Sequence, residues 1–315
     1  MKKLLPILFV LIITSCSKEV PSDQLVERNG IYYEVNSQTG FTGTSISYYE
    51  NGQLEEKITY TNGELDGSME LYFGNGQLQN KVTNKNGVLD GPSEVYFKNG
   101  QLQINTNFKK GELDGLSERY YPNGLLSFKG TYKNGELDGL SEEYYESGQV
   151  KEKSNYKDGF LDGPSEIYLE NGQFKEKSNY KDGIKNGLSE TFFEDGNLRS
   201  KRNYKDGKED GLSEWFYKGG ISSMKENYKD GKENGLSETF FEDGNLRSKR
   251  NYKDGKENGL SEWFYKGSIV KRKTHYEDNK KEGIERKFES SGKEFNFSPQ
   301  CYKNDKKVSI SKCQN

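Results

Sequence analysis

The apolar and polar positions of this chain return at a fixed interval. Glycines recur every 24 residues, eleven times without a slip, from Gly43 to Gly283, and an aromatic residue stands five positions after each. These aromatics are Tyr48, Tyr72, Tyr96, Tyr120, Tyr144, Tyr168, Phe192, Phe216, Phe240, Phe264 and Phe288. Residues 187–234 and 235–282 are nearly identical, which indicates tandem duplication of a two-unit block. The pattern is typical of a repeat protein whose units stack on their neighbours.

Each 24-residue unit predicts a β-hairpin. In the unit that starts at Gly187, two short strands flank Asp195-Gly196, a dipeptide suited to a two-residue turn in which both residues have positive φ. This turn places the residue three after the unit start opposite the residue fourteen after it. Eight units carry Glu and Lys at these positions: Glu70/Lys81, Glu118/Lys129, Glu142/Lys153, Glu166/Lys177, Glu190/Lys201, Glu214/Lys225, Glu238/Lys249 and Glu262/Lys273. The charge pairing supports the register independently of the turn.

The same register predicts aromatic residues on both faces of the sheet. Phe193, Leu198 and Tyr204 fall on one face, and Phe192 falls on the other with the Glu and Lys residues. We therefore predict an all-β fold: an elongated, single-layer twisted sheet or solenoid of tandem hairpins, in the form of a rod or an open coil. Each hairpin would pack on the next, and no globular core would be required.

Composition agrees with this expectation. The chain has 315 residues and no alanine, and only 30% of its residues are hydrophobic, including 13% that are aromatic. Few aliphatic side chains remain for a conventional core, and good helix formers are scarce. The net charge of −3 and the regular aromatics argue against disorder.

The first residues read as a targeting segment. Lys2 and Lys3 precede an apolar run over 4–13 that is too short to span a bilayer and suits a secretory signal. The sequence from Ile13 to Cys16 resembles a bacterial lipobox, in which the Cys is lipidated and becomes the mature N-terminus. We predict a signal peptide over 1–15, lipidation at Cys16 and a tether over 16–28. The alternatives are an uncleaved anchor and a buried Cys. Ser17 after the Cys resembles lipoproteins sent to the outer membrane, so the expected location is the cell envelope.

The unit resembles a known repeat. Its Gly-x-Ser-Glu opening with two aromatics, its Asn-Gly turn and its Tyr-Lys-(Asp/Asn)-Gly close, as in 139–159, resemble the MORN repeat variant of bacteria. The resemblance implies an N-terminal cap over 29–42, ten repeats over 43–282, and a degenerate last repeat with a C-terminal cap over 283–315. Such proteins are often assigned to a YwqK-type antitoxin family, which implies neutralisation of a toxin. MORN repeats in general imply scaffolding.

Candidate catalytic chemistry is sparse. His275 is the only histidine, so neither a Ser-His-Asp triad nor a His-rich metal site can be assembled. The dipeptides from Asp66-Gly67 to Asp162-Gly163 form a 24-residue series at the second turn, and a calcium ladder there is conceivable. Their spacing matches no EF-hand loop, and turn geometry explains them. We expect no enzyme activity, no metal and no cofactor, and the charge disfavours nucleic acid as a partner.

Binding is the expected function. Trp215, Trp263, Tyr217 and Tyr265 are the candidate partner-binding aromatics, with the alternative that these rings only stack the hairpins. Cys301 and Cys313 are a possible disulfide, or two free thiols. The sequence thus predicts a lipid-anchored, non-catalytic scaffold for a protein or polysaccharide of the envelope. The alternative is an antitoxin or immunity protein that neutralises a toxin by direct binding.

Overall fold

The computed structural model describes residues 18–313, and in this range the chain is built from β-strands. Two short 3-10 segments, η1 and η2, are the only helical elements described, and neither is long and apolar enough to cross a membrane. The chain divides into two compact units within strand β11 (Leu126–Lys133). The predicted all-β class of tandem hairpins is confirmed.

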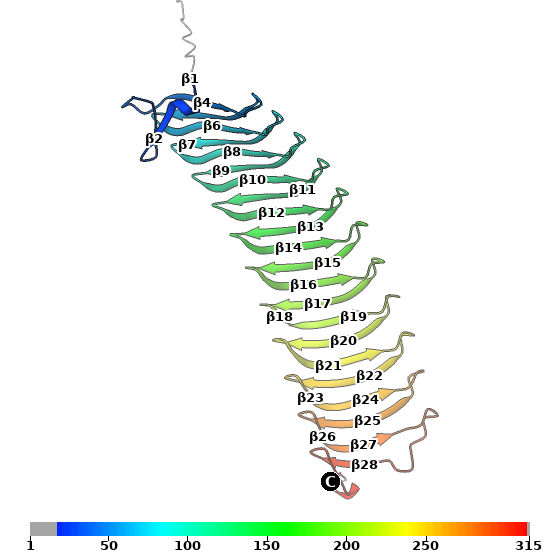
Figure 1. The fold of residues 1–315 in the computed structure, drawn as a ribbon. Helices are drawn as coiled ribbons and strands as arrows, with labels where there is room; N and C mark the ends of the chain where they lie inside the picture. The colour runs from blue at the N-terminus through cyan, green and yellow to red at the C-terminus, as the bar shows by residue number, and fades with distance from the viewer. Residues whose placement is uncertain (1–17, 314–315) are drawn as a thin grey trace, which may run out of the picture. The chain divides into compact units, whose positions relative to one another are not determined.

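The first unit holds an N-terminal cap and the first hairpins. Its elements are β1 (Glu19–Pro21), η1 (Ser22–Gln24), β2 (Leu25–Arg28), β3 (Ile31–Glu34), β4 (Gly43–Tyr48), β5 (Leu54–Thr61), β6 (Glu64–Tyr72), β7 (Leu78–Lys85), β8 (Val88–Tyr96), β9 (Leu102–Lys109) and β10 (Glu112–Tyr120). From β4 to β10 each strand pairs antiparallel with the next (Figure 1).

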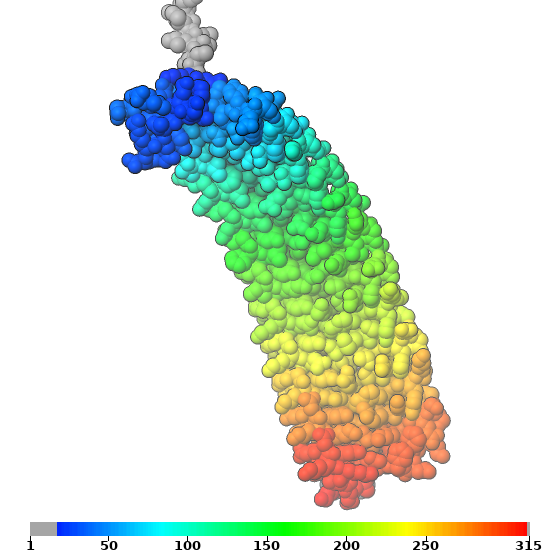
Figure 2. All heavy atoms as spheres, in the orientation of Figure 1, coloured from blue at the N-terminus to red at the C-terminus, as the bar shows by residue number. Residues whose placement is uncertain are grey.

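The cap supplies the one apolar core of this unit. Strand β1 runs parallel to β4, and β2 and β3 form a separate hairpin. Val20 and Phe41 are buried with Ile58 and Tyr60 of β5, against the first repeat. On the surface, the blue residues of the cap lie beside the first hairpins of this unit (Figure 2). The predicted tether over 16–28 is therefore wrong for residues 19–28, which are ordered parts of the cap. The reason is physical: Val20 and Leu25 cover apolar side chains that the first hairpin would otherwise expose to water.

The second unit continues the series to the C-terminus. Its elements are β12 (Glu136–Tyr144), β13 (Val150–Lys157), β14 (Phe160–Tyr168), β15 (Phe174–Lys181), β16 (Ile184–Phe192), β17 (Leu198–Lys205), β18 (Lys208–Glu209), β19 (Gly211–Phe216), β20 (Ser222–Lys229), β21 (Lys232–Phe240), β22 (Leu246–Lys253), β23 (Lys256–Glu257), β24 (Gly259–Phe264), β25 (Val270–Glu277), β26 (Lys280–Lys281), β27 (Gly283–Lys287), β28 (Gln300–Lys303), β29 (Lys306–Val308) and η2 (Ile310–Cys313). A disulfide joins Cys301 of β28 to Cys313 of η2, with their Cα atoms 5.9 Å apart.

The predicted hairpin register is observed, but the turn that produces it is different. Glu190 lies opposite Lys201, and the equivalent pairs follow in six other hairpins. The Gly196 N–H donates to the Phe193 carbonyl at 2.9 Å, and of the Asp195-Gly196 pair only Gly196 has positive φ, +84°. The loop is thus a three-residue turn with Gly in the left-handed position. A one-residue bulge between Thr191 and Phe192 then restores the expected register.

The bulge also corrects one predicted face. Leu198 pairs with Phe192 and therefore lies on the face of Phe192, whereas the sequence placed it with Phe193 and Tyr204. That placement was wrong because it assumed an unbroken alternation from the turn onward. The two-residue turn with two positive φ values is found instead at the close of each repeat, as at Asp206 (φ 49°) and Gly207 (φ 79°).

The Asp-Gly series lies inside strands rather than at a turn. Asp90-Gly91 falls within β8, where the register shifts against β7. The Asp side chains accept hydrogen bonds from the closing turn of the following unit: Asp90 from the Lys110 N–H, and Asp162 from the Asp182 N–H, each at 3.3 Å. These carboxylates join consecutive repeats.

Small polar residues take the place of a core in most repeats. Ser213 and Ser261 are fully buried, and Ser154 and Ser178 are hydrogen-bonded to Ser165 and Ser189 at 2.8 Å. Apart from the cluster of the cap and the first repeat (Val20, Phe41, Ile58 and Tyr60), Cys301 is the only hydrophobic residue of 18–313 that is buried. The repeats are therefore held by strand pairing and neighbour contacts, as a one-dimensional array requires.

Candidate binding recesses

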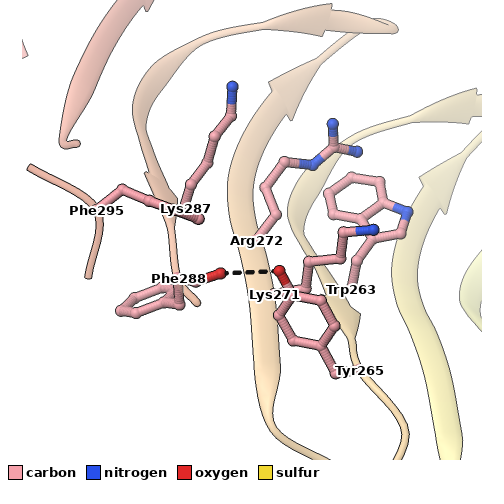
Figure 3. Close-up of a pocket in the computed structure, with 7 residues that line it drawn as sticks. All are labelled: Trp263, Tyr265, Lys271, Arg272, Lys287, Phe288 and Phe295. Carbon is pink, nitrogen blue, oxygen red and sulfur yellow. Dashed lines mark hydrogen bonds between the residues drawn. The ribbon is translucent and has the colours of Figure 1, made fainter. Parts of the chain in front are cut away.

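A recess opens between the last hairpins of the second unit. It has a volume of about 300 Å³ and is lined by Trp263, Tyr265, Lys271, Arg272, Lys287, Phe288 and Phe295, which we call the terminal recess (Figure 3). Trp263 is the last residue but one of β24, Lys271 and Arg272 lie in β25, and Lys287 ends β27. The volume is at the lower end of small-molecule pockets and suits one ring-sized group.

A stacked Arg-Trp pair forms one wall of the terminal recess. Trp263 lies opposite Arg272, which in turn lies opposite Lys287 on the next strand. The Arg272 guanidinium carbon is 3.5 Å from the centroid of the Trp263 ring, a close cation–π contact (Figure 3). Arg272 Nε is buried without a hydrogen-bond partner among the described residues. The contact with Trp263 restrains the guanidinium, and the two terminal Nη groups form the end of its fork.

Aromatic side chains and two lysines complete the terminal recess. The Tyr265 hydroxyl donates to the Phe288 carbonyl at 3.1 Å, and Lys271 Nζ lies 5.4 Å from the Tyr265 ring centroid. Lys287 Nζ lies 3.1 Å from Oε1 of Glu285, and Glu285 is not part of the lining. The lining therefore has three cationic side chains and no carboxylate.

The same kind of recess recurs four repeats earlier. Leu169, Lys175, Glu176, Thr191, Phe192 and Arg199 each stand 96 residues before a residue of the terminal recess, and they line a recess of about 540 Å³. Glu194 contributes a second carboxylate there. Burial opposes ionisation of Glu176, but hydrogen bonds from Lys185 at 2.6 Å and Ser178 at 2.7 Å hold its pKa below the usual range. The geometry is thus repeated, while the charge of the lining changes.

The two predicted tryptophans occupy equivalent places with different neighbours. Trp215 lies opposite Met224, whereas Trp263 lies opposite Arg272, and both tryptophans are half-buried. Tyr217, the counterpart of Tyr265, donates its hydroxyl to the Phe240 carbonyl at 2.9 Å. The structure thus places Tyr217 and Tyr265 as links between consecutive repeats.

Sequence reasoning missed the cations of the terminal recess. Lys271, Arg272 and Lys287 stand where the chain 48 residues earlier has Ser223, Met224 and Thr239. Comparison of the two copies could have found Lys271 and Arg272, and comparison of the next repeat with the repeat 48 residues earlier could have found Lys287, since all three departures add positive charge.

The other predicted residues lie apart from the recesses. Cys16 lies outside the described residues. The disulfide of Cys301 and Cys313 closes the C-terminal cap, and His275 is an exposed strand residue opposite Leu260. Within 18–313, no group of three or more His, Cys, Asp or Glu side chains is arranged to hold a metal ion.

A buried acidic pair lies in the middle of the second unit. Glu226 is 7% exposed and accepts a hydrogen bond from the Tyr228 hydroxyl at 2.6 Å. Burial raises the pKa of Glu233, and its neighbour Glu226 raises it further, while Arg250 opposes the shift. The raised pKa of Glu233 means that its neutral form is easier to reach beside Glu226 than it would be in water.

The fold and the recesses define a class, a repeat protein of tandem β-hairpins with binding recesses between repeats. Seven segments match the family of the MORN repeat variant: residues 41–62, 89–110, 113–134, 137–158, 161–182, 185–206 and 233–254. These seven repeats thus match the MORN repeat variant, in agreement with the sequence resemblance.

More distant comparisons add little. No curated protein matches the sequence. Matching solved structures include the crystal structures of TcdB2-TccC3-TEV, TcdB2-TccC3 and TcdB2-TccC3-Cdc42, each with 12% identity over 82% of this chain. Their TM-scores are 0.20, 0.19 and 0.18, and the match covers only 15%, 17% and 18% of those chains. Similarity of this degree carries no information on function.

Proposed function

We propose that this protein is a lipid-anchored protein of the bacterial cell envelope whose MORN-variant repeats form a non-catalytic binding scaffold for a polysaccharide or protein. The observation that carries the proposal is the recurrence of one recess at equivalent positions of two repeats, with different linings. Repetition of a site along an array allows many weak contacts to add up to firm binding.

Framework and lining use different residues, except that Tyr265 lines the terminal recess and also links two repeats through its hydroxyl. The hairpins depend on turn glycines, buried Ser residues and the Glu-Lys ladder, none of which lines the terminal recess. Lining residues such as Arg272 and Lys287 can therefore differ between repeats without loss of the fold. A scaffold that recognises an extended partner needs this separation.

The anchor rests on the sequence. The described chain begins at Lys18, whose carbonyl accepts a hydrogen bond from Thr44 of β4 at 2.8 Å. A lipid on Cys16 would hold the array by the cap and leave the later repeats free for a partner. Several acyl groups would suffice for stable anchoring, because each buried methylene contributes about 0.8 kcal/mol.

The test compares the native protein with Cys16→Ser in cells labelled with palmitate. We expect label and membrane fractionation in the native protein, and loss of both in the variant. The purified Cys16→Ser protein is then offered envelope polysaccharide and envelope protein fractions, and we expect it to retain one of them. An unlabelled, cytoplasmic protein bound to a toxin would overturn the proposal and support the antitoxin alternative.

A further inference from the structure

The terminal recess combines positive charge with aromatic walls. Lys271, Arg272 and Lys287 line it together with four aromatic side chains, and no acidic residue takes part in the lining (Figure 3). The whole chain carries a net charge of −3, so this concentration of cations is local. A ligand that fits must be anionic and must present an apolar surface.

Arg272 is the residue prepared for the anion. Its guanidinium lies over the Trp263 ring, and its buried Nε has no hydrogen-bond partner among residues 18–313. Arg202 and Arg250 also have an unpartnered Nε, but Arg202 donates to Glu209 at 3.1 Å and neither lines this recess. A fixed guanidinium edge matches the two oxygens of a carboxylate, which it binds through two parallel hydrogen bonds.

We propose that the terminal recess binds the carboxylate-bearing sugar ring of an acidic polysaccharide, a uronic acid unit. The carboxylate lies on the edge of Arg272 with Lys271 and Lys287 nearby, and the C–H face of the sugar packs on the aromatic walls, whose ring faces are electron-rich. This inference rests on the proposed scaffold function and names the ligand of one of its recesses.

The backbone around the recess favours a sugar over an acidic peptide. Peptides that add to a sheet do so through free main-chain groups at an edge. Here the Phe288 N–H donates to the Lys271 carbonyl and the Phe295 N–H to the Lys287 carbonyl, each at 3.0 Å, and the Phe288 carbonyl accepts from Tyr265. The side chains, and not these backbone groups, remain to bind a ligand.

The positions 48 residues before those of the terminal recess provide a natural comparison. Trp215, Tyr217 and Phe240 repeat the aromatic arrangement, while Ser223, Met224 and Thr239 replace the three cations. Among the positions that correspond to the lining, only Arg247, which corresponds to Phe295, carries a charged side chain. The two sets of positions share the aromatic arrangement and differ in the positive charge that would bind the carboxylate.

The experiment uses the fluorescence of Trp263. The chain has two tryptophans, so Trp215→Phe leaves Trp263 as the single reporter. In this background, an oligogalacturonate is titrated against the full-length protein, with the matched neutral galactose oligomer and poly-glutamate as comparison ligands. We expect a change in Trp263 fluorescence with the oligogalacturonate alone, and weaker binding at higher salt.

Two sets of variants locate the site. Lys271→Ser, Arg272→Met and Lys287→Thr together give the recess the side chains found 48 residues earlier, and we expect affinity to fall about tenfold or more. Arg272→Lys keeps the charge but loses the fork, and we expect several-fold weaker binding. The matched control, Lys205→Ser with Lys229→Ser and Lys253→Ser, removes three exposed cations from closing turns and should leave affinity near that of the parent at moderate salt.

Three results would overturn the inference. These are equal binding of the neutral oligomer, equal loss of affinity in the control set, and poly-glutamate binding that the recess variants abolish. The last would identify an acidic-peptide site. The proposed scaffold function would still stand if the recess variants retained the envelope partner, so the two failures can be told apart.

Discussion

The clearest test of how the repeats are joined is removal of one tyrosine hydroxyl. In several repeats a tyrosine donates to the backbone carbonyl 23 residues later, as Tyr49 does to Tyr72, Tyr145 to Tyr168, Tyr217 to Phe240 and Tyr265 to Phe288. In Tyr217→Phe the ring remains and only this link is lost. The chain itself shows that Phe is accepted here, since Phe193 and Phe241 occupy the same place in their repeats.

The magnitude follows from the geometry. The Tyr217 hydroxyl is 2.9 Å from the Phe240 carbonyl and partly buried, and a neutral hydrogen bond of this kind contributes about 1 kcal/mol. Because contacts in such an array are between neighbours, the loss should appear locally. Opening of the interface would then become about fivefold more frequent. The reverse change, Phe241→Tyr, adds a hydroxyl 23 residues before Phe264 and should slow opening by up to the same factor.

The assay is hydrogen exchange followed by mass spectrometry on the full-length protein. Faster exchange is expected in peptides from 211–258 for Tyr217→Phe, slower exchange in peptides from 235–282 for Phe241→Tyr, and no change in the N-terminal cap. Unchanged exchange in Tyr217→Phe would refute the role of this bond, and an effect spread evenly over the chain would refute neighbour-limited coupling. If the hydroxyl serves only the fold, the same variant retains the partner.

Three further predictions concern turns and titrating groups. Gly63→Ala should destabilise the protein more than Gly87→Ala. Both glycines have positive φ, which costs about 1–2 kcal/mol for a residue with a side chain, but only at Gly63 would the added Cβ lie 2.4 Å from Ile31 Cγ2. Thermal unfolding should therefore show a larger loss for Gly63→Ala, and equal losses would contradict the packing of the cap. Glu233→Gln should stabilise the protein at neutral pH. Because the pKa of Glu233 is raised in the folded state, its contribution to stability is complete below the unfolded pKa of 4.5 and is lost as pH rises through the folded pKa. Urea unfolding should show a gain in stability at neutral pH that disappears in acid, and a loss at neutral pH would refute the repulsion between Glu233 and Glu226. Burial and a 2.6 Å hydrogen bond to Glu166 raise the pKa of Tyr168 from 10.0 to about 12. The contribution of Tyr168 to stability is therefore complete below pH 10 and is lost as pH rises through about 12. The difference in tyrosinate absorbance between wild type and Tyr168→Phe should show a group that titrates late, and titration near pH 10 would contradict this.

Much of the repeat could be predicted from the sequence because its causes are local. The 24-residue period fixes the hairpin, and the pairing of Glu190 with Lys201 fixes the register through charge. The turn could not be settled in the same way, since Asp-Gly suits both a two-residue turn and a three-residue turn followed by a bulge. Both give the same register at Glu190, but only the observed one moves Leu198 to the other face.

The cap and the recesses depend on contacts that the period does not contain. Residues 19–28 have no repeat to compare, and Val20 becomes recognisable as core only when β1 is seen beside β4. The terminal recess joins Trp263, Arg272 and Lys287 from three strands, and these residues come together only through the pairing of β24, β25 and β27. The tryptophan was predicted as a candidate, whereas the cations around it were not.

The separation of framework from lining has a consequence for how such a chain changes over generations. Copying 48 residues, as in 187–234 and 235–282, adds complete hairpins whose glycines, serines and Glu-Lys pairs already fold. The new copy is redundant at first, so its lining is free to vary without risk to the rest of the array. Two substitutions in the new copy, at the positions of Ser223 and Met224, together with Lys287 in the following repeat, then separate an almost neutral surface from the cationic one around Arg272. New specificity in such a protein arises when duplication first lengthens the chain and a few lining residues are substituted afterwards.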